Sequence, residues 1–63
     1  TPFEYLLRYR LEQSKSILDK DSLSTITEIA MACGFSTTSY FIKVFKARYG
    51  MTPKQYQKYH HTN

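Results

Sequence analysis

One pattern limits most of what this chain can fold into: two short apolar helices separated by a glycine corner, within residues 25–45. Thr25 and Glu28 have the spacing of a capping box, which predicts that a helix begins there. Apolar residues then recur at helical spacing up to Gly34, which can end a helix in a left-handed conformation without steric cost. Phe35 is expected to fold back onto the apolar face of this helix. The pattern therefore predicts a helix-turn-helix.

Helix signals cover the rest of the chain. A long amphipathic helix is predicted over Pro2–Leu18, opened by the capping-box spacing of Thr1 and Glu4. No strand pattern is present, so we expect an all-α fold, a small helical bundle with a homeodomain-like helix-turn-helix after a long helix. The other predicted helices are Ile26–Cys33, Thr38–Tyr49 after a cap at Ser36 or Thr37, and Pro53–His60.

Size and composition exclude several classes of protein. A chain of 63 residues with a single cysteine must form one small domain held by apolar packing. We expect Cys33 to be a small buried hydrophobe, and His60 and His61 to belong to a solvated tail. No membrane span, signal peptide, catalytic constellation or metal-ligand spacing is visible. We therefore expect a monomeric, cytoplasmic protein that is not an enzyme and has no cofactor, metal, membrane or small-molecule partner.

Charge is distributed unevenly along the chain, whose net charge is +4. Every acidic residue lies at or before Glu28, so residues 1–28 sum to −1 and residues 29–63 to +5. The basic half carries the second helix of the predicted motif, and a basic surface attracts polyanions. Together with the motif, this predicts double-stranded DNA as the partner. A basic surface that only keeps the chain soluble is the alternative.

The second helix of the motif has two different faces. A projection at about 100° per residue groups Tyr40, Phe41, Val44, Phe45 and Ala47 on the face expected to join the core. The opposite face combines hydroxyl, aliphatic and lysine side chains, which can contact base edges, a thymine methyl and guanine in the major groove. The base-contacting residues predicted on this face are Thr38, Ser39, Ile42 and Lys43. A solvated helix face is the alternative.

Five further residues are predicted to contact DNA phosphates. Lys46 lies one turn beyond the base-contacting group, where the helix should leave the groove. The others lie where helices begin, and their amides favour anions. Plain helix capping explains Thr25 and Thr52 equally well. Arg10 on the first helix is expected to have a structural role, and its side chain can reach either solvent or a carboxylate on another helix. The full phosphate-contacting set is Lys46, Thr25, Thr27, Thr52 and Lys54.

The chain also contains an internal echo. Residues 1–5, Thr-Pro-Phe-Glu-Tyr, resemble residues 52–56, Thr-Pro-Lys-Gln-Tyr, and the second copy directly follows the helix-turn-helix. By the same logic, the first copy would follow another helix-turn-helix. Because a Thr-Pro pair is also a common start of a helix, the echo by itself is weak.

These residues resemble the C-terminal part of AraC/XylS-type bacterial transcription regulators. The resemblance implies two helix-turn-helix units joined by a long linker helix, with base contacts on the face already identified. It implies a DNA-binding subdomain over residues 1–63: the linker helix at 1–20, the second unit at 25–50, a final short helix at 52–60 and a tail at 61–63. Ser14 and Gln57 depart from the usual Ala and Arg. The matching positions are Ile26, Ile29, Ala30, Gly34, Phe35, Ser39, Tyr40, Phe41, Phe45, Lys46, Gly50, Thr52, Pro53 and Tyr56.

Two functions follow for testing. The first is sequence-specific binding of duplex DNA within a transcription regulator, with the helix at about 38–49 in the major groove. The second is a helical protein-interaction module that contacts RNA polymerase or a partner domain. DNA binding through lysines should weaken steeply as salt rises, whereas an apolar protein contact should not.

Overall fold

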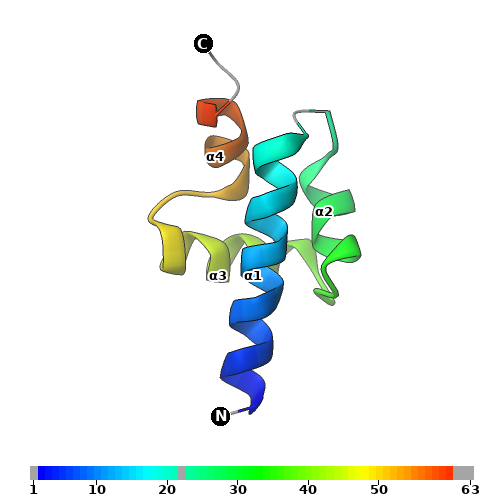
Figure 1. Cartoon of the computed structure of the whole chain (residues 1–63), viewed down its shortest axis with the longest axis vertical. Helices are drawn as coiled ribbons and strands as arrows, with labels where there is room; N and C mark the ends of the chain where they lie inside the picture. Colours follow the sequence, from blue (N-terminus) through cyan, green and yellow to red (C-terminus); the bar gives the residue numbers. More distant parts are fainter. Residues whose placement is uncertain (1, 22, 61–63) are drawn as a thin grey trace.

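The computed structural model describes residues 2–21 and 23–60, which form four helices (Figure 1). The described residues contain no strand, and the predicted all-α fold is confirmed. The predicted cap at Thr1, the side chains of His60 and His61, and the tail at 61–63 lie outside what is described. The helices are α1 (Pro2–Lys20), α2 (Ile26–Ala32), α3 (Thr38–Tyr49) and α4 (Pro53–His60).

The longest helix, α1, extends two residues beyond the predicted end at Leu18. The amide of Asp21 still donates a hydrogen bond to the carbonyl of Ile17, 2.9 Å away. The carboxylate of Asp21 then accepts the amides of Leu23 and Ser24 at 2.8 and 3.1 Å, which turns the chain toward α2. A side chain that bonds the following amides competes with the helical pattern, and this competition ends the helix.

The corner between α2 and α3 is a Schellman motif. Gly34 has a positive φ of 90°. Its amide donates to the carbonyl of Met31 at 3.1 Å, and the amide of Phe35 reaches back to the carbonyl of Ala30 at 2.9 Å. Phe35 and Ala30 are both buried, which supplies the apolar contact of this motif. Cys33 caps α2, so the helix ends one residue earlier than predicted.

The core is built where α3 crosses α1 (Figure 1). Phe41 and Phe45 are fully buried, and their ring centroids are 5.7 Å apart. The ring centroid of Phe35 lies 4.8 Å from that of Phe41, so aromatic rings form a continuous column along α3. The buried residues that pack with this column from the other helices are Leu11, Leu18, Ile29, Ala30 and Tyr56.

The buried stripe of α3 is narrower than the sequence predicted. Tyr40 and Ala47, both assigned to the core face, are exposed. The buried stripe is centred on Phe41 and Phe45, so Tyr40 and Ala47 lie beyond one of its margins. Tyr49 is half-buried, and its ring centroid lies 4.6 Å from that of Phe45. None of the described helices is long and apolar enough to cross a membrane.

Replacing Gly34 with alanine should lower the free energy of unfolding by about 1–2 kcal/mol, because an L side chain is strained at positive φ. Its new Cβ would also lie 3.1 Å from the Arg10 Nε. Gly50→Ala is the matched control, because Gly50 has a φ of 82° and no atom within 4 Å of a Cβ built there. Urea denaturation should show a loss for Gly34→Ala at least as large as that for Gly50→Ala. An unchanged midpoint for Gly34→Ala would contradict the assigned turn.

Phe45→Ala should destabilise the chain by about 3–5 kcal/mol, because it removes a fully buried ring from the centre of the core. So small a domain is expected to lose most of its helical circular dichroism. Ile42→Ala, on the half-buried margin of the same helix, should cost much less. If the Ile42 variant unfolds while the Phe45 variant remains folded, the inward face of α3 has been wrongly assigned.

Candidate nucleic-acid interface

The outward face of α3 carries the predicted base-contacting residues. Ser39 and Lys43 are exposed, while Thr38 and Ile42 are half-buried at the margin. At about 100° per residue, Ser39 and Lys43 lie on the side of α3 opposite Phe41 and Phe45, whereas Thr38 and Ile42 lie beside the buried stripe. Their contact with bases stays a prediction. The described surface of α3 contains no acidic residue, so a polyanion meets no like charge on this helix.

The beginning of α3 is held in two ways. Thr37 is its N-cap, and the Thr37 side chain accepts the amide of Tyr40 at 3.2 Å. The Thr38 hydroxyl donates to the Thr27 hydroxyl of α2 across 3.4 Å. The structure therefore brings one predicted phosphate-contacting residue, Thr27, next to one predicted base-contacting residue, Thr38. The exposed Tyr40, which the sequence assigned to the core, widens the accessible surface at this end.

Two other predicted phosphate contacts are helix caps. The Thr25 hydroxyl accepts the amide of Glu28 at 3.1 Å, and Glu28 accepts the amide of Thr25 at 2.9 Å. Thr52 and Gln55 form the same reciprocal pair at the start of α4, at 3.2 and 3.0 Å. The capping role that the sequence allowed for both threonines is thus present. Their hydroxyl hydrogens are still available to a phosphate, because each hydroxyl only accepts in its box.

The basic phosphate-contacting candidates, Lys46 and Lys54, lie on either side of the turn between α3 and α4. Lys46 is exposed in the last turn of α3, and Lys54 is exposed in the first turn of α4. A helix of twelve residues spans about 18 Å, so Lys46 lies about 12 Å along α3 from Thr38, whereas Thr52 and Lys54 lie where the chain enters α4. Thr27 thus lies beside the start of α3, and Lys46 lies in its last turn.

A network around α4 holds the α1–α2 connection. The amide nitrogen Nε2 of Gln57 donates to the carbonyls of Asp21 and Ser24 at 3.3 and 3.0 Å. The Tyr56 hydroxyl donates to the Asp19 carboxylate at 2.6 Å. Gln57 is itself buried, so its amide fixes the loop that leads into Thr25. The sequence alone identified Gln57 only as a missing charge, because its partners are backbone carbonyls distant in the chain.

The remaining titratable groups point to structural roles. The Cys33 thiol is half-buried, and this burial raises its pKa, so the unreactive protonated form is favoured at neutral pH. The Lys15 ammonium lies 6.0 and 5.8 Å from the ring centroids of Tyr49 and Tyr56, within the range of cation–π attraction. Over residues 2–21 and 23–60, no group of three or more His, Cys, Asp or Glu side chains is arranged to hold a metal ion.

Comparisons with known proteins agree with this architecture. A family model described as a helix-turn-helix domain matches residues 1–59. The chain is 39% identical over 57 residues to the probable transcriptional regulator LumQ of Photobacterium leiognathi, covering 90% of this chain and 23% of that protein. It is 40% identical over 58 residues to the uncharacterized HTH-type transcriptional regulator YdeC of Bacillus subtilis, covering 92% and 20%.

A third relative matches a shorter stretch. The porin thermoregulatory protein EnvY of Escherichia coli is 64% identical over 31 residues, which is 49% of this chain and 12% of that protein. The chain thus spans less than a quarter of the length of each of these three relatives. No solved structure matches the chain significantly.

Alkaline pH should test the contact between Tyr56 and Asp19. Burial, with the hydrogen bond to the Asp19 carboxylate, raises the pKa of Tyr56 from 10.0 to about 12. Because the folded state holds this proton more tightly, its stabilisation is complete below about pH 10 and is lost as the pH rises through about 12. Chemical denaturation across this range should show that Tyr56→Phe reduces the alkaline loss of stability, whereas Tyr59→Phe, an exposed control, should not. Equal alkaline losses in the parent chain and Tyr56→Phe would contradict this origin.

Proposed function

The chain belongs to the helix-turn-helix family of AraC/XylS-type transcription regulators, and on that premise we propose that it binds specific duplex DNA sequences with α3 in the major groove. Membership of this family supports a general role in DNA binding and the regulation of transcription. The proposal adds which helix enters the groove, which residues read bases and which contact the backbone. It rests on one observation above all: α3 buries the aromatic rings of Phe41 and Phe45 and exposes polar and basic side chains.

The two faces of α3 support insertion into a groove. Phe41 and Phe45 anchor the helix, so its exposed side chains start from a fixed backbone rather than from a loop. Ser39 and Lys43 lie in the first half of α3, the half of a recognition helix that contacts base edges. We assign base contacts to this half: Thr38, Ser39, Ile42 and Lys43.

Backbone contacts are assigned to the residues that flank this group. Lys46 lies one turn after Lys43, where a helix passing through the groove approaches the phosphates. Thr27 and the Thr25 cap lie on the α2 side, and the remaining two candidates, Thr52 and Lys54, lie at the start of α4. Contacts on both sides of the groove fix the register of the helix without reading sequence.

We further propose that α1 is the linker helix of a two-unit reader. In the echo between residues 1–5 and 52–56, Pro53 and Tyr56 are buried, whereas Pro2 is exposed and Tyr5 is 73% exposed. The proline and the tyrosine of this pattern are thus packed against the core at α4, whereas the same two positions are open to solvent at α1. A preceding helix-turn-helix packed on that face would leave residues 25–50, followed by the helix at 52–60, as the second unit.

Replacing Lys43 and Lys46 one at a time distinguishes contact with bases from contact with the phosphate backbone of DNA. Lys43→Ala should cost about 1–3 kcal/mol of binding on a preferred duplex and little on a scrambled duplex, because it removes a base contact. Lys46→Ala should weaken both duplexes similarly and reduce the salt slope by about one unit, because it removes a phosphate contact. The measurement is titration of duplexes selected from random sequence, at several salt concentrations.

Lys20→Ala serves as the control, because Lys20 ends α1 and belongs to neither predicted set. If both α3 lysines weaken every duplex equally, base readout by Lys43 is wrong. If no duplex is selected and partner binding is insensitive to salt, the protein-interaction alternative replaces DNA binding.

A further inference from the structure

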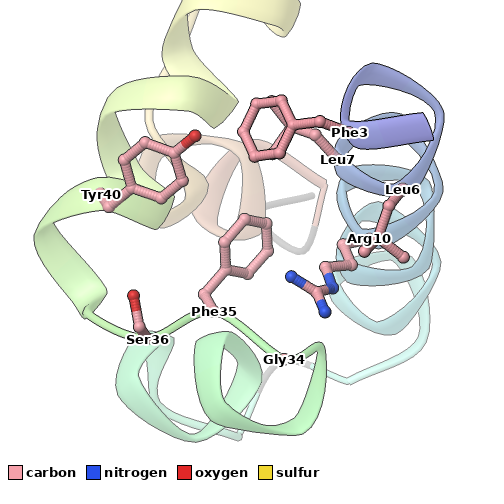
Figure 2. Close-up of a pocket in the computed structure, with 8 residues that line it drawn as sticks. All are labelled: Phe3, Leu6, Leu7, Arg10, Gly34, Phe35, Ser36 and Tyr40. Carbon is pink, nitrogen blue, oxygen red and sulfur yellow. The ribbon is translucent and has the colours of Figure 1, made fainter. Parts of the chain in front are cut away.

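An apolar groove lies between the N-terminal half of α1 and the corner that leads into α3 (Figure 2). Its volume is about 300 Å³. Phe35, which is buried, and Leu7, which is half-buried, lie at its base. The side chains of Phe3 and Tyr40 face each other across it, and Leu6 extends the α1 side. These three rim residues are 65%, 39% and 42% exposed, respectively.

A single cation, Arg10, lies at one end of this groove, beside Gly34 (Figure 2). The sequence suggested an inter-helix carboxylate as one partner for Arg10. Within the described part of the chain, its guanidinium makes no hydrogen bond or ion pair, and no acidic residue lines the groove. By contrast, Arg8 on the same helix pairs with Glu12 at 3.5 Å. A guanidinium presents paired donors that fit the two oxygens of a carboxylate.

We propose that this groove binds a segment of another protein that presents bulky aliphatic side chains next to a glutamate or aspartate, with the carboxylate on Arg10. Charge complementarity favours an acidic residue in the partner, because Arg10 is the only charged group among the described residues that line the groove, and the whole chain carries +4. The exposed rim selects a protein segment, since small ligands usually have 70–90% of their surface buried in a concave site.

The groove is separate from both surfaces assigned above. The predicted base-contacting residues Thr38, Ser39 and Lys43 do not line it. Phe3 and Arg10 are seven residues apart and share one stripe of α1, whereas Tyr5 lies on another side of the helix. The proposal therefore stands or falls independently of DNA binding and of a preceding unit.

A matched pair of peptides tests the proposal: acetyl-leucyl-glutamyl-leucine amide and the same peptide with glutamine in place of glutamate. Each is titrated into the isotope-labelled chain while the Arg10 Nε–H and the Gly34 amide are followed by NMR. The glutamate peptide should bind about tenfold more tightly, because only a carboxylate forms a charge-assisted pair with the guanidinium. Both signals should shift together. Because this comparison uses the unmodified chain, it does not depend on the folding of any variant.

Four variants locate the site. Arg10→Gln should reduce the affinity for the glutamate peptide to that of the glutamine peptide, and Phe3→Ala should weaken both peptides. Arg8→Gln removes a cation, and Tyr5→Ala an exposed aromatic ring, from α1 outside this groove, so both should bind like the parent chain. Equal affinity for the two peptides, or no shift up to their solubility limit, would overturn the proposal. So would binding of free benzoate as tightly as the glutamate peptide, because the occupant would then be a small ligand.

Discussion

The column of aromatic rings along α3 is the interaction on which the rest of the structure depends. Phe35 and Phe41 pack at a tilt with ring centroids 4.8 Å apart, and Phe41 and Phe45 pack edge to face at 5.7 Å. Phe45 then meets the ring of Tyr56 of α4, also edge to face, at 5.8 Å. These rings bring all four helices into one core, since residues of α1 and α2 pack around them. They also determine which side of α3 remains outside. Stability and the candidate DNA surface are thus two consequences of one packing arrangement.

Polar contacts, and not the apolar core, position the connection between α1 and α2. Within this connection, Leu23 is 91% exposed. The shape of the connection follows from the Asp21 carboxylate and from Gln57, which bonds two of its carbonyls from α4. Buried amide groups of this kind are costly if unpaired, so they specify one loop conformation. The final helix therefore helps to orient the start of α2, where Thr25 and Thr27 lie.

The long helix α1 divides into two halves with different surroundings. Its C-terminal half contributes Leu11, Ser14 and Leu18 to the core, and the Ser14 hydroxyl bonds the Leu11 carbonyl at 2.6 Å. Its N-terminal end projects beyond the other three helices (Figure 1), and Phe3, Tyr5 and Tyr9 on it are more than half exposed. Tyr5 and Tyr9 share one side of this end by helical spacing, and Phe3 lies on another side, in the groove. Both the proposed preceding unit and the proposed groove partner would use this end.

The sequence by itself determined the four helices, the capping boxes at Thr25 and Thr52 and the glycine corner, because each depends on residues within about one helical turn of one another. It also predicted Phe41 and Phe45 as core, since a 3.6-residue period needs no knowledge of the partner helix. Only the tertiary structure decided the width of that stripe, which left Tyr40 and Ala47 outside. It alone gave Gln57 its backbone partners and placed Arg10 beside Gly34, without a partner among the described residues, because these contacts join residues more than twenty positions apart in the chain. The candidate base contacts share one side of α3 for local reasons, whereas the pairing of Thr27 with Thr38 depends on how α2 and α3 pack.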